Sequence, residues 1–214
     1  LGGAPGVEPA NVVILGGGVV GENAALIATG MNAKVFIVDK SSKRLEELKQ
    51  IFGNKINPIL SQESNLEDLV KECDLLIGGV LIPGAEAPKL ITKNMIKLMK
   101  RGSVVVDVAI DQGGCSETSR PTSHDTPTYF EEDVLHYCVT NMPGAYSRTA
   151  TQALNNVTTR WISLLAANDL QSACRNRPEL LSGINCTGGK LTCPPVGEAH
   201  SLSTVSPAEV LELH

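Results

Sequence analysis

Short runs of apolar residues, many of them β-branched, recur along the chain and are separated by longer segments of mixed polarity. The clearest runs cover residues 12–15, 35–38, 75–77, 104–108 and 136–140. Such runs are typical of strands that are buried on both faces of a parallel sheet. A weaker run at residues 56–60 contains Pro58. Because proline cannot donate a hydrogen bond to a strand ladder, we expect this strand at the edge of the sheet.

Amphipathic spacing between these runs predicts the helices. Besides the helix that follows the first strand, it predicts helices over residues 43–52, about 65–72, 92–99 and about 149–170. Alternation of strands and helices is typical of a parallel sheet, because each parallel crossover places a helix on a face of the sheet. Crossovers are nearly always right-handed, which gives the default strand order 3-2-1-4-5-6. The fold class is therefore α/β, with a Rossmann-type doubly wound parallel sheet.

The first strand leads directly into a glycine motif. Gly16, Gly18 and Gly21 fit G-x-G-x-x-G, a helix follows, and Asp39 closes the next strand. In the dinucleotide-binding fingerprint, the first glycine allows a tight turn, the second lets the backbone approach the pyrophosphate, and the third lets the helix pack closely. The acidic residue accepts hydrogen bonds from the ribose and repels a 2′-phosphate. The motif predicts binding of NAD, and its alternative is a glycine-rich turn that binds nothing.

The predicted strand ends place further candidates at the same edge. In doubly wound sheets, ligands bind outside the carboxyl ends of the strands. After the glycine motif and Asp39, the predicted ends are Ser61, Val80–Leu81, Val108–Asp111 and Asn141–Met142. Residues 111–129 form a long polar segment rich in Gly, Ser, Thr and Pro. Loops of this length without regular structure are commonly functional or disordered.

Composition excludes several classes of partner. Apolar residues make up 42% of the chain, and the formal net charge is −5 without a basic patch, so we expect no nucleic-acid partner and no anionic membrane partner. No apolar run approaches the ~20 residues that span a bilayer, and no signal peptide is evident. We expect a cytoplasmic protein. The chain starts with Leu-Gly-Gly rather than Met, and we expect it to be a fragment of a longer protein.

The six cysteines are dispersed and none form a C-x-x-C pair. Zinc-site spacing is therefore absent, and we expect reduced thiols and no metal site. Cys115 is the only cysteine in the polar, glycine-rich loop, and no activating partner is evident for it.

Three later segments carry a resemblance to a known family. They read VLIPGAEAPKLIT (80–92), VVVDVAIDQGGCSETSRPTSHDTPTY (104–129) and VTNMPGAYSRTAT (139–151). They closely resemble bacterial-type alanine dehydrogenases, and the alpha subunit of nicotinamide nucleotide transhydrogenase is a more distant relative. The resemblance implies oxidative deamination of L-alanine to pyruvate and ammonia with NAD, the reverse amination, and a homohexameric assembly.

The resemblance also implies roles for individual residues. Asp39 would hold the adenosine ribose, with Arg44 beside it, where the family usually has lysine. Asp111 matches the active-site aspartate of the family, and Arg120 matches an arginine that contacts the cofactor. The complete set of expected cofactor-binding residues is Gly16, Gly18, Val19, Val20, Gly21, Asp39, Arg44, Ser61, Val80, Leu81, Val108, Ala109, Ile110, Asp111, Arg120, Val139, Thr140, Asn141 and Met142.

Part of the family's active site has no counterpart in this sequence. The lysine, histidine and arginine that bind the substrate belong to an amino-terminal domain that is absent here. We therefore expect a NAD-binding domain over residues 1–148, and a long helix with an irregular tail over residues 149–214 that packs towards the absent domain. The fragment alone should be inactive. Two alternatives remain: the NAD(H)-binding component of a proton-translocating transhydrogenase, and a non-catalytic NAD-binding module.

Several candidate residues also have a purely structural interpretation. From its position alone, Asp111 could equally cap its own loop, and Arg120 could bridge its loop to the backbone. Asp107 is expected to be a structural residue at a strand end. His124 and His136 lie apart from any nucleophile or metal-spaced partner and are expected to be structural or surface groups. Trp161 is expected in core or interface packing.

Overall fold

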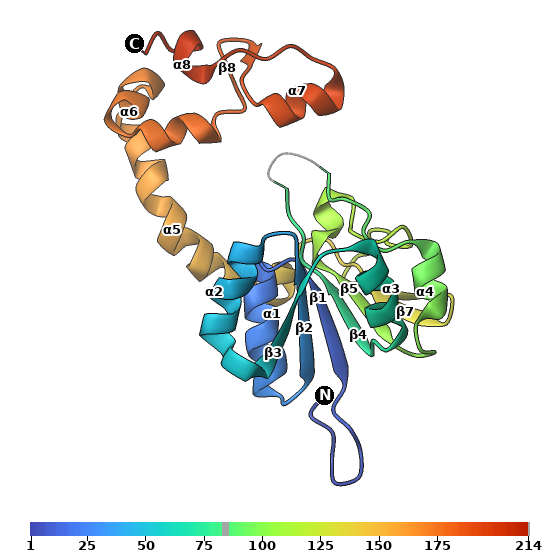
Figure 1. The fold of residues 1–214 in the computed structure, drawn as a ribbon. Coiled ribbons are helices and arrows are strands. Elements are labelled where there is room, and N and C mark those ends of the chain that lie inside the picture. Colours follow the sequence, from blue (N-terminus) through green and yellow to red (C-terminus); the bar gives the residue numbers. More distant parts are fainter. Residues whose placement is uncertain (83–85, 214) are drawn as a thin grey trace. The chain divides into compact units, whose positions relative to one another are not determined.

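A mostly parallel sheet forms the centre of the first part of the chain (Figure 1). The computed structural model describes residues 1–82 and 86–213, and within these the sheet has the strand order β3-β2-β1-β4-β5-β7-β6. The strands are β1 (Asn11–Leu15), β2 (Lys34–Asp39), β3 (Ile56–Leu60), β4 (Leu75–Gly78), β5 (Val104–Asp107), β6 (Thr128–Glu131) and β7 (Val134–Tyr137). All neighbours are parallel except β6 and β7, which are antiparallel. The predicted order is confirmed for the parallel strands, and the strand with Pro58 lies at an edge.

Two sequence-based expectations about this sheet are wrong. The strand predicted at 136–140 begins earlier, at Val134, and ends at Tyr137. Its partner strand β5 ends at Asp107 and continues into a 3₁₀ helix, so the ladder stops there. The residues after Tyr137 form only an isolated bridge, between Val139 and Thr122. The polar segment 111–129 is also less irregular than expected, because it runs into β6, the edge strand that pairs with β7.

Helices cover both faces of the sheet (Figure 1). Helices α1 (Val19–Gly30) and α2 (Ser42–Phe52) pack on one face, against Val12 and Ile14 of β1. Helices α3 (Glu63–Lys71) and α4 (Lys93–Leu98) pack on the other, against Val13 and Leu15. Because side chains alternate along a strand, β1 contributes to both cores. It is the central strand from which the glycine turn emerges.

Local capping explains where α2 and α4 begin. The hydroxyl of Ser41 accepts a hydrogen bond from the backbone N–H of Arg44 at 3.2 Å, and Thr92 accepts one from Met95 at 3.2 Å. Each cap satisfies an N–H group that the first turn leaves free. Helix α2 ends at Gly53, whose φ is +60°.

The residues after Met142 belong to a second compact unit. Its elements are α5 (Ser147–Ala167), α6 (Leu170–Asn176), η4 (Pro178–Gly183), β8 (Cys186–Thr187), β9 (Lys190–Leu191), α7 (Pro194–His200) and α8 (Pro207–Val210), and η3 (Met142–Tyr146) precedes them. Helix α5 is the predicted long helix. Within the described chain none of its residues are buried. The expected division of function between residues 148 and 149 stays a prediction.

Candidate dinucleotide-binding site

Of the predicted glycines, Gly16 and Gly18 lie in the turn between β1 and α1, and Gly21 lies near the start of α1. Gly16 has a φ of +91°, a conformation that favours glycine, and a Cβ there would lie 2.9 Å from the carbonyl oxygen of Gly79. Gly21 is buried, and a Cβ on it would collide with the carbonyl oxygen of Gly16. A Cβ on Gly18 would meet nothing within 4 Å. A side chain would therefore clash with the protein at Gly16 and Gly21, whereas the space beside Gly18, at the amino end of α1, is open.

Gly17, which sequence reasoning left out, lies between Gly16 and Gly18 in the turn and is buried. Its N–H donates to Asp39 Oδ2 at 2.6 Å, and its carbonyl oxygen accepts from Arg44 Nε at 2.6 Å. A Cβ on Gly17 would lie 2.8 Å from Leu48 Cδ1. The available signal was the run of three consecutive glycines, of which G-x-G-x-x-G uses only two.

The carboxylate of Asp39 is fixed by backbone donors at the end of β2. Oδ2 accepts the N–H of Gly17, and Oδ1 accepts the N–H of Ser41 at 2.8 Å. A carboxylate oxygen can accept two hydrogen bonds, so each oxygen keeps one acceptor position. Asp39 is therefore oriented while it remains able to accept two hydroxyl groups.

Arg44, in the first turn of α2, contacts the glycine turn through Gly17. Its guanidinium hydrogen-bonds to Gly17, pairs with Glu22 of α1, and pairs with Glu47 of α2 at 3.1 Å. The hydrogen bonds to Glu22 and then to Glu47 raise the pKa of Arg44 above its ordinary value. Arg44 does not line the cavity described next.

A cavity of about 490 Å³ adjoins the turn at the carboxyl edge of the sheet. This volume lies within the range of small-molecule sites. The cavity is lined by Gly16, Gly18, Val19, Val20, Val38, Asp39, Lys40, Ser61, Gly79, Val80, Leu81, Ile82, Pro88 and Leu90. Of the expected cofactor-binding residues, it brings together Gly16, Gly18, Val19, Val20, Asp39, Ser61, Val80 and Leu81. Sequence reasoning missed the rest of the lining, including Lys40, which directly follows Asp39.

The expected residues Val108 to Asp111 lie in a short 3₁₀ helix after β5. This helix, η2 (Val108–Gln112), is capped by Asp107, whose buried carboxylate accepts the N–H of Ala109 at 3.1 Å. Asp111 is exposed, and none of the described residues hydrogen-bond to its carboxylate. The capping role that was the structural alternative for Asp111 is therefore filled by Asp107.

The other expected residues follow β7 or lie near the edge strand. Val139 is buried, Thr140 and Asn141 are exposed, and Asn141 has a φ of +53°. Met142 begins η3. The guanidinium of Arg120 lies 4.1 Å from the centre of the Tyr129 ring, in a depression separate from the cavity. The structure therefore does not bring Arg120 to the cavity beside the glycine turn.

Two buried cysteines of the sheet domain, Cys73 and Cys115, are not activated thiols. Burial raises the pKa of the Cys73 thiol to about 12 and also raises that of Cys115, where Asp107 adds to the effect. Both thiols therefore stay protonated near neutral pH. Among the described residues, no cluster of His, Cys, Asp and Glu could hold a metal ion. No helix in the described part of the chain is long and apolar enough to cross a membrane.

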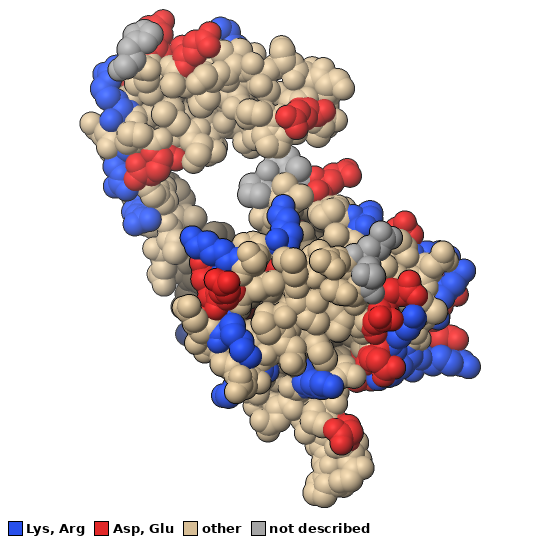
Figure 2. Space-filling view, in the orientation of Figure 1, with Lys and Arg blue, Asp and Glu red and all other residues tan. Residues whose placement is uncertain are grey.

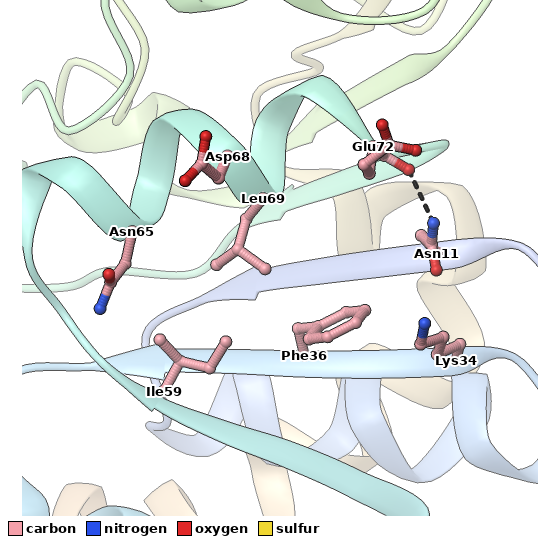
Figure 3. A pocket seen from close by; sticks show the side chains of 8 residues that line it. All are labelled: Asn11, Lys34, Phe36, Ile59, Asn65, Asp68, Leu69 and Glu72. Carbon is pink, nitrogen blue, oxygen red and sulfur yellow. Dashed lines mark hydrogen bonds between the residues drawn. The ribbon is translucent and has the colours of Figure 1, made fainter.

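A second depression, of about 540 Å³, lies elsewhere on the sheet (Figure 3). Phe36 and Ile59 line it from the strands, Leu69 faces them from α3, and the side chain of Asn11 donates to the carbonyl oxygen of Glu72 at 2.8 Å. It contains none of the expected site residues. It also reaches the amino ends of β1 and β2, whereas ligands of such sheets bind at the carboxyl ends. On the face drawn in Figure 2, acidic and basic side chains are interspersed.

The glycine turn after β1, the acidic residue that closes β2, and the cavity beside them define a Rossmann-type dinucleotide-binding domain. Comparison with known proteins then gives the family. The sequence profile of the family "Alanine dehydrogenase/PNT, C-terminal domain" matches residues 1–194. This chain therefore belongs to the alanine dehydrogenase/PNT family, through its C-terminal domain.

Individual relatives agree with this assignment. An alanine dehydrogenase of Halomonas elongata is 51% identical over 99% of this chain, and one of Methanococcus maripaludis is 53% identical over 98%. A solved structure of an L-alanine dehydrogenase superimposes with a TM-score of 0.84 at 48% identity, covering 94% of this chain and 55% of its own. The chain spans only 57% and 56% of the lengths of the first two relatives.

Proposed function

We propose that this chain is the NAD-binding portion of an alanine dehydrogenase, which oxidatively deaminates L-alanine to pyruvate and ammonia with hydride transfer to NAD. One observation carries the proposal: relatives named alanine dehydrogenase match nearly the whole chain at about half identity. The cavity beside Asp39 and the glycine turn supports the same function. The cofactor is NAD.

The residues that are present suit this cofactor. The N–H groups of the first turn of α1 have no partner within their helix, and together with the helix dipole they favour phosphate groups. The open space at Gly18 leaves room for such a group to approach. The free acceptor positions of Asp39 match the two ribose hydroxyls, and the apolar side chains of Val80, Ile82 and Leu90 offer a surface for a flat base.

The segments after β5 and β7 supply the reacting half of the site in this proposal. When bound, NAD accepts the hydride that leaves the substrate Cα. Val108–Asp111 and Val139–Met142 line the nicotinamide half of the cofactor. The exposed carboxylate of Asp111 acts on the substrate by orienting its ammonium group and by holding a proton. The family resemblance also gives Arg120 a contact with the cofactor, which would have to lie outside the cavity, because its guanidinium packs on Tyr129 in a separate depression.

Turnover belongs to a longer protein in this proposal. Residues 1–148 bind NAD, and residues 149–214 connect to the domain that holds the substrate carboxylate. The full enzyme is a cytoplasmic homohexamer. The support for these points is the family resemblance and the length of the relatives. The transhydrogenase alternative has less support, because relatives of about 50% identity are named alanine dehydrogenases. A non-catalytic NAD-binding module has no specific observation in its favour.

Titration of NADH into the 214-residue chain, followed by nicotinamide fluorescence, tests the proposal. Saturable binding is expected, and Asp39→Ala should weaken it about tenfold or more, because two hydrogen bonds to a charged group are lost. Asp68→Ala, which removes an exposed carboxylate from α3, is the matched control and should leave binding unchanged. The chain alone should form no NADH from NAD and L-alanine.

Each result has a distinct meaning. Absence of NADH binding by the unsubstituted chain would refute the proposed function. Equal binding by the Asp39→Ala and Asp68→Ala variants would remove Asp39 from the ribose-binding role. Alanine-dependent NADH formation by the chain alone would refute the assignment of turnover to a longer protein.

A further inference from the structure

Gly17 is held on both sides by charged side chains from two different elements. Asp39, at the end of β2, accepts its N–H, and Arg44, in the first turn of α2, donates to its carbonyl oxygen, each at 2.6 Å. The conformation of the glycine turn therefore depends on both side chains. Any change in the position of Arg44 acts on the backbone that faces the cavity.

The remaining bonds of Arg44 go to two glutamates. Nη2 pairs with Glu22, which lies in the first turn of α1, and Nη1 pairs with Glu47 at 3.1 Å, three residues further along α2. All three side chains are partly exposed, between 28% and 45%. The guanidinium thus connects the glycine turn, the start of α1 and the start of α2, and two carboxylates surround one cation.

Arg44 and Asp39 approach the same glycine without pairing with each other. A Cβ on Gly17 would lie 3.2 Å from Asp39 Oδ2 and 3.4 Å from Arg44 Cγ. Among the described residues, the ion pairs of Arg44 go to Glu22 and Glu47. The carboxylate of Asp39 therefore lies beside the cavity without an ion pair to Arg44, although both side chains bind Gly17.

This arrangement bears on the choice between two cofactors. In dinucleotide sites of this kind, a nearby arginine is the group that accommodates the 2′-phosphate of NADP, and a planar guanidinium binds phosphate strongly through two donors. Arg44 has the chemistry for that task, but each of its terminal nitrogens already donates to a carboxylate, Nη2 to Glu22 and Nη1 to Glu47. Its third nitrogen, Nε, donates to the carbonyl oxygen of Gly17.

We propose that Glu22 and Glu47 are specificity-determining residues that withhold Arg44 from a 2′-phosphate, and that Arg44 is a positioning residue that braces the glycine turn. The inference rests on the proposed NAD site. It differs from the role that the family resemblance gives to Arg44, because the guanidinium acts through Gly17 and not by contact with the ribose.

The double variant Glu22→Gln, Glu47→Gln tests the specificity role. It removes two charges with little change of shape, so Arg44 becomes free to pair with phosphate. The ratio of NADPH affinity to NADH affinity, measured by fluorescence titration of the chain, should rise about tenfold, since one charged hydrogen-bond partner is gained. Glu46→Gln, an exposed neighbour on α2, is the matched control and should change the ratio less than twofold.

The variant Arg44→Met tests the positioning role. It should weaken ADP-ribose and NADH about tenfold, because both place a pyrophosphate against the turn, while millimolar binding of adenosine changes less than twofold. Lys43→Met, which removes an exposed cation from the preceding position, should leave the binding of all three ligands unchanged. A merely structural role for Arg44 would weaken adenosine and ADP-ribose equally.

Circular dichroism at the assay temperature shows which variants are folded. If the double variant does not fold, the single variants Glu22→Gln and Glu47→Gln replace it and should shift the NADPH to NADH ratio in the same direction. An unchanged ratio in folded variants overturns the specificity role while NADH binding still supports the proposed function. Parallel loss of adenosine and ADP-ribose binding in Arg44→Met overturns the positioning role. Failure of the unsubstituted chain to bind NADH refutes both proposals.

Discussion

At the scale of single residues, Asp107 shows how the chain accommodates a buried carboxylate. The side chain is fully buried, and among the described residues no cation pairs with it. Instead, Oδ1 accepts from Ala109, while Oδ2 accepts from the N–H of Cys115 at 2.8 Å and from the hydroxyl of Ser119 at 2.5 Å. Such charge-assisted bonds offset the cost of burial. These bonds fix Ala109 and Cys115, the residues on either side of the segment that contains Asp111. Asp111 is therefore not needed to stabilise this segment.

His136 is a second buried polar residue, and its bonds define its tautomer. Nδ1 lies 3.0 Å from the carbonyl oxygen of Val134, which can only accept, so Nδ1 carries the hydrogen. In the neutral ring, Nε2 then accepts from the hydroxyl of Thr118 at 2.8 Å. Burial lowers the pKa of His136 below its ordinary value, although Val134 and the nearby carboxylates of Glu131 and Asp107 act in the opposite direction. The folded state thus holds a neutral imidazole.

This lowered pKa predicts loss of stability in acid. As pH falls below about 6.5, the ordinary histidine value, the unfolded chain takes up the proton before the folded chain does. The stability that His136 contributes is present above that pH and is lost as pH falls through the folded-state pKa, by at most about 1.4 kcal/mol per pH unit. Urea unfolding between pH 7.5 and 4.5, followed by circular dichroism, measures this slope.

The matched controls separate His136 from the other groups that titrate in this range. His136→Gln should flatten the slope, whereas His124→Gln, at an exposed position, should leave it as in the unsubstituted chain. A slope that is the same in all three proteins would contradict the assignment of a neutral folded-state imidazole.

At the scale of elements, the approach of α1 to the glycine turn is limited by the backbone itself. A Cβ on Gly21 would collide with a carbonyl oxygen, which cannot move aside as a flexible side chain can. At the other end of the same helix, a Cβ on Gly30 would meet nothing within 4 Å. Helix α1 therefore contains a matched pair of glycines, one required by packing and one not.

Gly21→Ala should lower the free energy of unfolding by about 2–3 kcal/mol, because α1 must move away from the sheet. Gly30→Ala should be neutral or raise it by up to about 1 kcal/mol, through the better helix propensity of alanine. Chemical denaturation measures both changes. Equal effects at the two positions would refute close backbone packing as the reason for Gly21.

The hairpin between β6 and β7 has a turn conformation that its two residues do not favour. Its two connecting residues, Glu132 and Asp133, both have positive φ, 51° and 61°. Two such residues form the type I′ turn that suits tight hairpins, which normally contains Asn-Gly or Asp-Gly. The chain uses two acidic residues there, so the turn carries conformational strain.

Asp133→Gly should relieve part of this strain and raise the free energy of unfolding by about 0.5–1 kcal/mol. The substitution also removes the ion pair between Asp133 and Arg101, at 3.3 Å, but the two side chains are 64% and 85% exposed, and exposed pairs contribute little. Arg101→Gln isolates that pair and should change stability by less than about 0.5 kcal/mol. Destabilisation by Asp133→Gly would show that the pair outweighs the strain.

At the scale of the whole molecule, the central sheet was predictable because its parallel strands are buried on both faces and therefore appear as apolar runs. The edge strand β6 was not, because Phe130 is exposed and only alternate residues face inward. The turn that follows β6 also lacks glycine, the usual signal for a hairpin. Burial on both faces leaves a clear signal in a sequence, and burial on one face at an edge leaves a weak one.

The candidate site also has a part that could be predicted from the sequence and a part that could not. The glycine turn and Asp39 are local in sequence and were predictable from their spacing. The ion pair between Arg44 and Glu22 joins residues that are 22 positions apart, and nothing in the spacing of charges singles out Glu22 as the partner. The position of Arg120 away from the cavity likewise depends on the edge hairpin, because the guanidinium of Arg120 packs on the ring of Tyr129 in β6.

The distribution of cysteines gives the two units different chemical reactivity. Cys73, Cys115 and Cys138 of the first unit are buried, whereas Cys186 of the second unit is exposed and Cys193 is partly so. A thiol-directed reagent under native conditions will therefore mark the second unit and leave the dinucleotide-binding unit chemically intact. The chain thus carries its own attachment point, through which it can be labelled with a dye or fixed to a surface without modifying the residues around Asp39.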